Sequence, residues 1–130
     1  MNRWDDSLAS RAIVQVGTVS DATFAKYRSR VVEMATMLQL SGTAATLAFL
    51  ASRPDPAHQL AGEHLAHELA PLVAMPPPEV NASAVAKAIL DLSVDDRIMM
   101  ERHARTYAGW MKRAVEIRRQ RAETKNAAVA

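Results

Sequence analysis

Apolar residues recur along this chain at the spacing of an α-helix, and no segment indicates a strand convincingly. One stripe runs from Ser20 to about Leu40, with apolar side chains at intervals of three and four residues: Phe24, Tyr27, Val31, Met34 and Leu38. A second stripe with the same intervals runs through the last long segment: Met100, Ala104, Tyr107, Met111 and Ala114. Side chains at these intervals share one helix face, so the pattern predicts two amphipathic helices with buried faces.

Capping residues and helix breakers delimit four further helices in the rest of the chain. We expect one over 7–17 with Ser7 as its N-cap, a short one over 44–51, one from about 57 to Ala70, and one that starts after Asn81 or Ser83. The segment 44–51 is apolar nearly all round, which predicts that it lies at the buried centre of the domain.

Prolines shape the middle of the chain. The helix from about 57 is expected to end or kink at Pro71, which lacks a backbone donor. Its inward face is predicted to comprise Ala61, Leu65, Leu69 and Leu72. The run Pro76-Pro77-Pro78 then predicts an extended and exposed connector.

The last helix is predicted to begin at Ser93 and to be the longest. Asp95 and Asp96 fall in its first turn, where the helix dipole favours negative charge. After Gln120 the apolar repeat is lost, and we expect the tail 121–130 to fray.

Composition supports an all-α fold, in the form of a compact bundle of five or six helices with a long C-terminal helix. The chain has 130 residues, enough for one domain, and 49% of them are hydrophobic. It contains 25 alanines against 4 glycines, a balance that strongly favours helix. We therefore expect a single helical domain over 1–120, followed by the frayed tail.

Several classes of protein are excluded by what the sequence lacks. No run approaches the roughly 20 apolar residues that a membrane span needs. There is no cysteine, which excludes disulfides, thiolate metal sites and cysteine nucleophiles. No apolar segment follows the polar N-terminus, so a signal peptide is not expected and a cytoplasmic location is predicted.

Catalytic and metal-binding patterns are also missing. His64 and His67 lie one helical turn apart but do not form the His-Glu-x-x-His pattern, so we interpret them as solvated. No phosphate-cradling glycine loop or Gly-x-Ser-x-Gly turn occurs. We therefore predict no enzymatic activity, no catalytic residue, no metal and no cofactor.

Charge is distributed very unevenly beneath a net value of +2. The segment 55–101 carries a net charge of −6, whereas 102–130 carries +6. Such asymmetry favours an acidic surface that contacts basic partners, a basic surface that binds nucleic acid, or both in one ribonucleoprotein subunit.

The last helix carries the candidate site. Arg105, Lys112 and Arg119 are seven residues apart and would form a line with steps of about 10 Å, opposite the apolar stripe. Further candidates flank or extend this line: Arg102, Arg113, Lys26 and Arg30, and in addition Arg11 and Arg28. A helix with cations on one side suits a phosphate backbone and does not read bases. The alternative is that these are ordinary solvated cations; Trp110 is interpreted as core or interface rather than a base-stacking platform.

Three stretches resemble the small subunit of type III-B CRISPR effector complexes, the Cmr complexes. They are Ser10-Arg11-Ala12 with Val14 and Val16, the segment from Met34 to Leu50, and the segment from Tyr107 to Glu116. The most specific is 41–50, a short turn followed by Thr-Leu-Ala-Phe-Leu. Ser41 stands where the family usually has Asn, and Thr43 where it usually has Leu.

This resemblance implies a non-catalytic helical subunit. Copies of it would stack along the inside of the effector, contact other subunits and help to hold the paired guide and target RNA. Because the guide supplies sequence recognition, such a subunit needs to hold only backbone and shape. The small subunit of another type III class is a close variant of this interpretation. The acidic segment 55–101 would then contact neighbouring subunits.

A second hypothesis is a protein-interaction module without RNA binding. Its docking face would be rich in methionine: Met34, Met37, Met99, Met100 and Met111. Methionines at helical spacing more often fill a core than line a groove. The two hypotheses differ in salt response, because RNA binding weakens steeply with salt and apolar docking does not.

Overall fold

The computed structural model describes residues 2–129, and within them the chain forms six α-helices, two short 3₁₀ turns and no strand. The helices are α1 (Arg3–Gly17), α2 (Asp21–Ser41), α3 (Thr43–Ser52), α4 (Pro56–Leu69), α5 (Ala82–Leu90) and α6 (Val94–Val129). The 3₁₀ turns are η1 (Ala70–Val73) and η2 (Pro77–Glu79). The all-α bundle with a long final helix is therefore confirmed.

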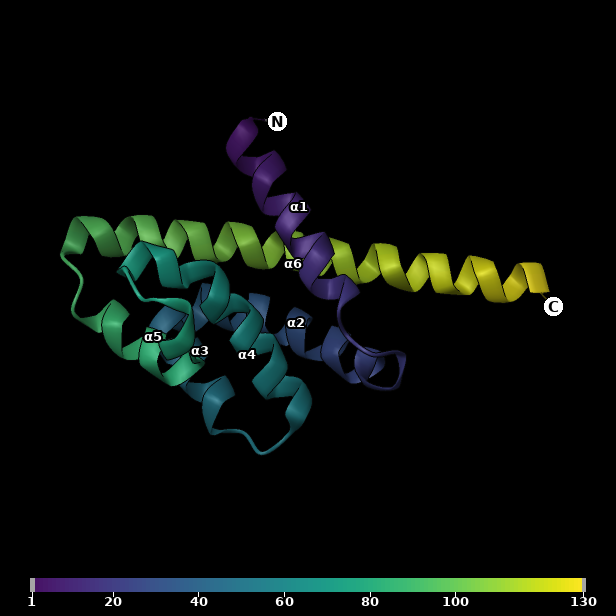
Figure 1. Ribbon diagram of the computed structural model, residues 1–130, viewed down its shortest axis with the longest axis horizontal. Coiled ribbons are helices and arrows are strands. Elements are labelled where there is room, and N and C mark those ends of the chain that lie inside the picture. The colour runs from purple at the N-terminus through teal and green to yellow at the C-terminus, as the bar shows by residue number, and fades with distance from the viewer. Residues whose placement is uncertain (1, 130) are drawn as a thin grey trace.

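The helix α6 runs the whole length of the molecule, and the other helices pack around its first two thirds (Figure 1). The helix α1 crosses α6 at a steep angle, and α2 packs against α6 as well. The helices α3, α4 and α5 contact one another and form a cluster beside the N-terminal half of α6. The C-terminal part of α6 projects beyond this bundle.

The two predicted apolar stripes meet in the core. Every member of the α6 stripe is buried, and on α2 four of the five are buried while Phe24 packs against the core from its edge. The two tyrosines, Tyr27 and Tyr107, are completely buried. The apolar helix α3 contributes Leu47 and Leu50 to the same core, but Ala45 and Ala48 are exposed, so α3 does not lie at the buried centre as predicted.

Cap residues explain where the helices begin. The Asn2 side chain accepts a hydrogen bond from the Asp5 backbone N–H at 2.9 Å, so α1 begins four residues before the predicted Ser7 cap. Asn81, rather than Ser83, caps α5 by accepting from the Ala84 N–H at 2.8 Å. The Asp96 N–H donates to the Ser93 hydroxyl at 3.2 Å, which confirms the predicted start of α6.

The proline-rich connection differs from the prediction in two respects. The 3₁₀ turn η1, which contains Pro71, follows α4 directly, so the backbone passes from α-helical to 3₁₀ geometry there. Leu72 consequently turns outward, with 47% of its surface exposed. The expected inward position of Leu72 is therefore wrong. The three prolines are exposed as expected, but Pro77 and Pro78 form part of η2 rather than an extended segment.

The helix α6 continues to Val129, beyond Gln120, in the tail for which the sequence predicts fraying. Residues 121–128 are all exposed, so burial gives this part of α6 little support. They contain neither Gly nor Pro and include alanines, Arg121, Glu123 and Lys125, all good helix formers. Once a helix is nucleated, each added residue of this kind prolongs it at little cost, so loss of the apolar repeat does not end α6.

Candidate nucleic-acid interface

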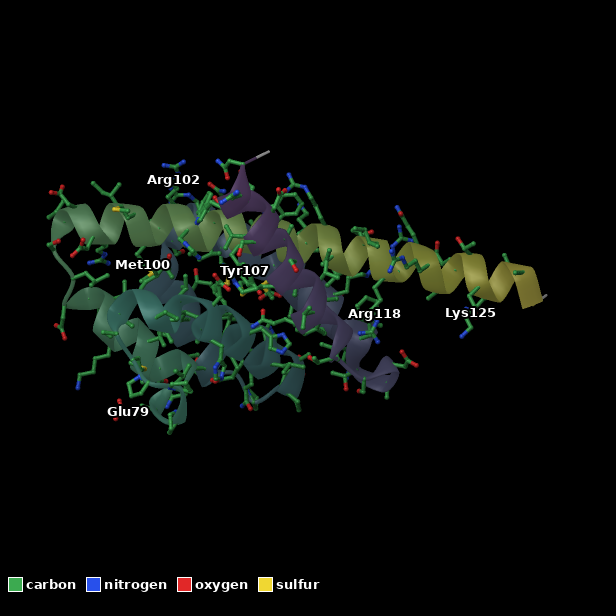
Figure 2. All side chains as sticks on the ribbon, turned by 45° about the horizontal axis from the view of Figure 1, so that its top comes forward. Glu79, Met100, Arg102, Tyr107, Arg118 and Lys125 are labelled. Carbon is green, nitrogen blue, oxygen red and sulfur yellow. The ribbon has the colours of Figure 1, made fainter. Side chains whose placement is uncertain are left out.

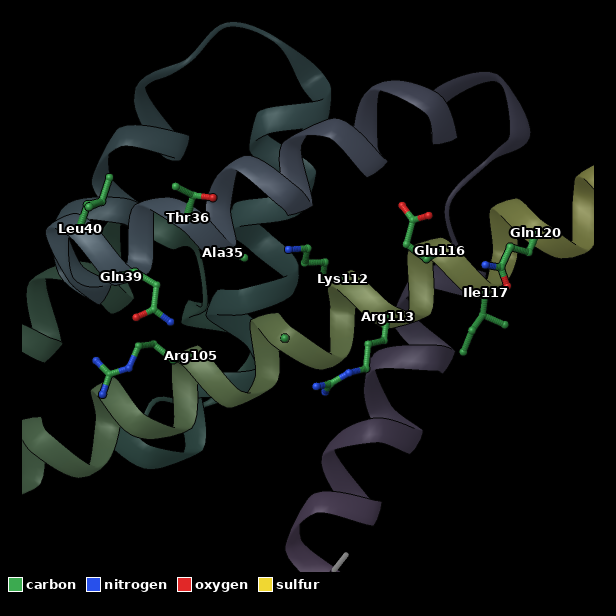
Figure 3. Close-up of a pocket in the computed structure, with 11 residues that line it drawn as sticks. Ala35, Thr36, Gln39, Leu40, Arg105, Lys112, Arg113, Glu116, Ile117 and Gln120 are labelled. Atoms are coloured by element: carbon green, nitrogen blue, oxygen red, sulfur yellow. The ribbon is translucent and has the colours of Figure 1, made fainter.

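A groove of about 820 Å³ lies between α2 and α6. The α2 side is formed by Ala35, Thr36, Gln39 and Leu40. The α6 side presents three exposed cations, Arg105, Lys112 and Arg113 (Figure 3). Figure 3 shows Lys112 directed toward α2 and Arg113 leaving α6 in a different direction. The groove thus combines a mostly apolar floor with a cationic edge.

Among residues 2–129, none of the three cations forms an ion pair with a carboxylate. One carboxylate, Glu116, does line the groove. Its oxygens accept hydrogen bonds from Arg119 at 2.9 Å and Arg28 at 3.3 Å, and the Arg119 bond is the main reason that its pKa is lowered. The groove therefore keeps an uncompensated positive charge.

A second cavity, of about 440 Å³, adjoins the groove on α6 and lies beside the first turns of α1. Asp5 of α1 and Thr106 and Trp110 of α6 contribute to its wall. The guanidinium carbon of Arg113 lies 4.7 Å from the Trp110 ring centroid, a cation–π distance. Arg105, Gly109 and Arg113 line both this cavity and the groove.

The predicted line along α6 is only partly available to a ligand. Arg119 donates to Glu116 at 2.9 Å and to Glu123 at 2.7 Å, and the Glu116 bond is the main reason that its pKa is raised. Two members of the line, Arg105 and Lys112, lack such pairing within the described chain. The structure therefore brings Arg105 and Lys112 together with Arg113, rather than with Arg119.

The remaining sequence candidates lie outside the groove. Arg30 is paired with Glu33 at 3.0 Å and Asp55 at 3.2 Å. Lys26 is exposed on α2. Arg102 lines neither the groove nor the smaller cavity; it lies where α6 faces the start of α1, with its guanidinium carbon 5.5 Å from the Trp4 ring centroid (Figure 2).

The basic residues considered as extensions of the line are paired too. Arg11 binds Glu68 through two hydrogen bonds of 2.8 and 2.9 Å, and Arg28 pairs with Glu116. Arg118, which the sequence did not single out, donates to the Val16 carbonyl at 2.7 Å and to Asp21 at 2.9 Å. It holds the end of α1 on α6 and is structural.

The histidines behave differently from the prediction. His67 is exposed as expected, but His64 is half-buried, with Nδ1 2.6 Å from the Tyr27 hydroxyl. Burial, and secondarily the charge of His67, lower the pKa of His64 to about 4. No cluster of three or more potential metal ligands occurs among the residues that the structure describes.

A family model described as CRISPR-associated protein (Cas_Cmr5) matches residues 5–118. This match covers most of the chain. The chain belongs to the Cmr5 family.

The Cmr5 fold is shared with a solved relative. The crystal structure of a CRISPR-associated Cmr5 family protein from Thermus thermophilus superposes with a TM-score of 0.75, and the match covers 90% of this chain and 97% of that one at 21% identity. No curated protein sequence matches at a significant level. Membership of the Cmr5 family makes the chain a small, structural subunit of the Cmr complex, with the other Cmr subunits as its partners.

The segment by which the sequence most resembles the Cmr5 family forms a turn that α6 holds in place. Gly42 has a φ of 82°, a left-handed conformation that favours glycine. The Thr43 backbone N–H and hydroxyl both donate to Glu101, the hydroxyl at 2.6 Å. Thr43 is completely buried, so its hydroxyl needs the acceptor that Glu101 provides.

The sequence did not point to Gly109, and it predicted Trp110 to be core or interface; both residues line cavities on α6. Gly109 lines both cavities, and Trp110 lines the smaller one. Gly109 has an arginine four residues before it and another four residues after it within a continuous helical repeat, and this spacing is a sequence signal that could have identified it.

No helix in the described residues has the length and apolar character of a membrane span.

Proposed function

We propose that this Cmr small subunit holds RNA by its sugar–phosphate backbone in the groove between α2 and α6, and acts as a non-catalytic scaffold in the effector complex. The observation that carries the proposal is the set of three exposed cations around one groove, none of them paired with an acid in the described chain. Phosphate contacts from Lys and Arg supply affinity and orientation without sequence preference.

The availability of these cations matters more than their number. A guanidinium that already binds two carboxylates, as Arg119 does, must lose those bonds before it can contact phosphate. Arg105, Lys112 and Arg113 have no such bonds to lose among residues 2–129. They are therefore the proposed RNA contacts, while Arg102, Arg119, Lys26 and Arg30 are secondary.

A different surface suits contact with neighbouring subunits. The corner between α5 and α6 exposes four large apolar side chains: Leu90, Val94, Ile98 and Met99. Exposed acids lie among them: Asp91, Asp95 and Asp96. An exposed apolar patch beside charged residues is typical of a protein contact, and it lies in the segment 55–101 that carries the negative charge.

The positions of the methionines do not support the alternative of a methionine-rich docking face. Met34, Met100 and Met111 are buried in the core, with at most 2% of their surface exposed. Met37 is half-buried, and Met99 is exposed at 70%. These residues fill the bundle interior and do not form one surface.

The test is the salt dependence of RNA binding by the full chain, measured by fluorescence anisotropy with a labelled single-stranded RNA. We expect the variant R105Q/K112Q/R113Q to bind more weakly and to lower the slope of log K against log salt by about 2, since each single-strand phosphate contact contributes roughly 0.7. K87Q, which removes an exposed cation on α5, is the matched control. An unchanged slope in the triple variant would refute the proposal.

A further inference from the structure

Gly109 occupies a position where packing does not require glycine. It lies in the middle of α6, and a Cβ built there would meet no atom within 4 Å. Gly62 is the opposite case, because its Cβ would come within 3.0 Å of the Leu50 Cβ. Glycine within a helix is less stable than alanine, so Gly109 weakens α6 without improving any internal contact.

The missing side chain leaves a notch between two guanidiniums. Arg105 and Arg113 lie one turn before and one turn after Gly109 on neighbouring parts of the same face. All three residues line both the groove on the α2 side and the cavity on the α1 side. Gly109 has no side chain, so it is the least bulky position on α6 between the two cavities. A ligand that extends from one cavity into the other therefore crosses the helix at Gly109.

We infer that one strand of RNA crosses α6 over Gly109, with a phosphate in the notch between Arg105 and Arg113. This inference rests on the proposed function and adds the direction of the strand, which crosses α6 instead of running along it. A path along the helix would need Arg119, whose guanidinium is already bound to two carboxylates. A crossing path needs only the cations that border the notch, together with Lys112.

The two cavities are suited to different parts of the strand. The groove holds Lys112, and its single acid, Glu116, is bound by arginines, so it accommodates phosphate. The smaller cavity includes Asp5, which repels phosphate, and Trp110, whose indole packs well against a sugar or base. Both volumes lie in the range of about 300–1,000 Å³ typical of sites for small groups.

The test adds side chains at the notch without changing charge. Gly109→Ala and Gly109→Leu are compared with the original chain for binding of the same labelled single-stranded RNA, and thermal unfolding is followed by circular dichroism. We expect Gly109→Ala to unfold at a higher temperature and yet bind more weakly. Gly109→Leu should bind about tenfold more weakly, as for displacement of one charge-assisted contact. Gly17→Leu is the control, because Gly17 also has open space around it and lines neither cavity.

The outcomes separate this inference from the proposed function. If Gly109→Leu binds RNA as tightly as the original chain while R105Q/K112Q/R113Q binds weakly, the crossing is refuted and RNA binding stands. If neither variant weakens binding, both are refuted. Weaker binding by both Gly109 variants, with Gly17→Leu unchanged and all variants folded, supports the crossing.

Discussion

Glu101 shows how a single side chain on α6 determines where another helix starts. The helix α3 has no side-chain cap of its own, and its first N–H, at Thr43, donates to both Glu101 oxygens at 3.0 Å. Glu63 acts in the same way for α5, accepting from the Ala82 N–H at 2.9 Å. Carboxylates from distant positions therefore satisfy the free backbone donors at these two helix starts.

Replacing Glu101 should destabilise the bundle. Glu101→Ala leaves the buried Thr43 hydroxyl and the Thr43 N–H without their acceptor, so we expect the free energy of unfolding to fall by about 1–3 kcal/mol. Urea denaturation measures this value. Glu79→Ala, at an exposed position in η2, is the control. Equal midpoints for the two variants would contradict the capping role.

His64 should make the stability depend on pH. Its pKa is lowered to about 4 in the folded chain, while the unfolded chain keeps an ordinary value near 6.5. Between these values the unfolded state binds more protons, so stability falls as the pH falls from about 6.5 toward 4. We expect the urea midpoint to decrease from pH 7 to pH 5, and to decrease less in His64→Asn. The same decrease in both proteins would show that another group is responsible.

At the scale of elements, α6 consists of two parts with different support. From Met100 to Val115 its apolar stripe is buried against α1 and α2. From Arg121 to Ala128 every residue is exposed, and Figure 2 shows Lys125 on this projecting part. The projecting part is held only by helix propensity and by local pairs such as Arg119 with Glu123.

Truncation after Gln120 should therefore leave the bundle intact. We expect the melting temperature to change by less than about 3 °C, because residues 121–128 are exposed and small free-energy changes shift the melting temperature only slightly. The mean helical signal in circular dichroism should decrease in proportion to the residues removed. A melting temperature lower by about 10 °C would mean that the projecting part stabilises the bundle.

At the scale of the whole molecule, Glu68 connects three helices. From α4 it accepts hydrogen bonds from Arg11 of α1, at 2.8 and 2.9 Å, and it lies 2.8 Å from the His103 ring of α6. Its side chain is 6% exposed. Burial raises the pKa of the Glu68 carboxyl, but the hydrogen bonds from His103 and Arg11 outweigh burial and hold the pKa below its usual value.

Removal of Glu68 should cost more than removal of Arg11. Glu68→Ala leaves His103 and Arg11 without their acceptor, and we expect a loss of about 2–4 kcal/mol in the free energy of unfolding. Arg11→Ala should cost about 1 kcal/mol or less, since its side chain is 48% exposed. Urea denaturation of both variants measures the difference. If the two losses were equal, Glu68 would act through Arg11 alone.

Part of the candidate site could be predicted from the sequence alone. The seven-residue spacing of Arg105 and Lys112 places them on one side of a helix, and the structure agrees because that spacing is a local property. The pairing of Arg119 with Glu116 and Glu123 was also local, at intervals of three and four residues. The pairing of Arg30 with Asp55 was not, because it joins α2 to the cap of α4.

The sequence by itself determined that the chain is helical, which side of α2 and α6 is buried, and to which family the chain belongs. The tertiary structure decided that α2 and α1 lie on opposite sides of Gly109, and so created the two cavities. It also decided that Glu101 reaches Thr43 and that Glu68 reaches Arg11. Periodicity fixes the buried face of each helix, but the position and rotation of one helix against another depend on contacts between residues far apart in the chain.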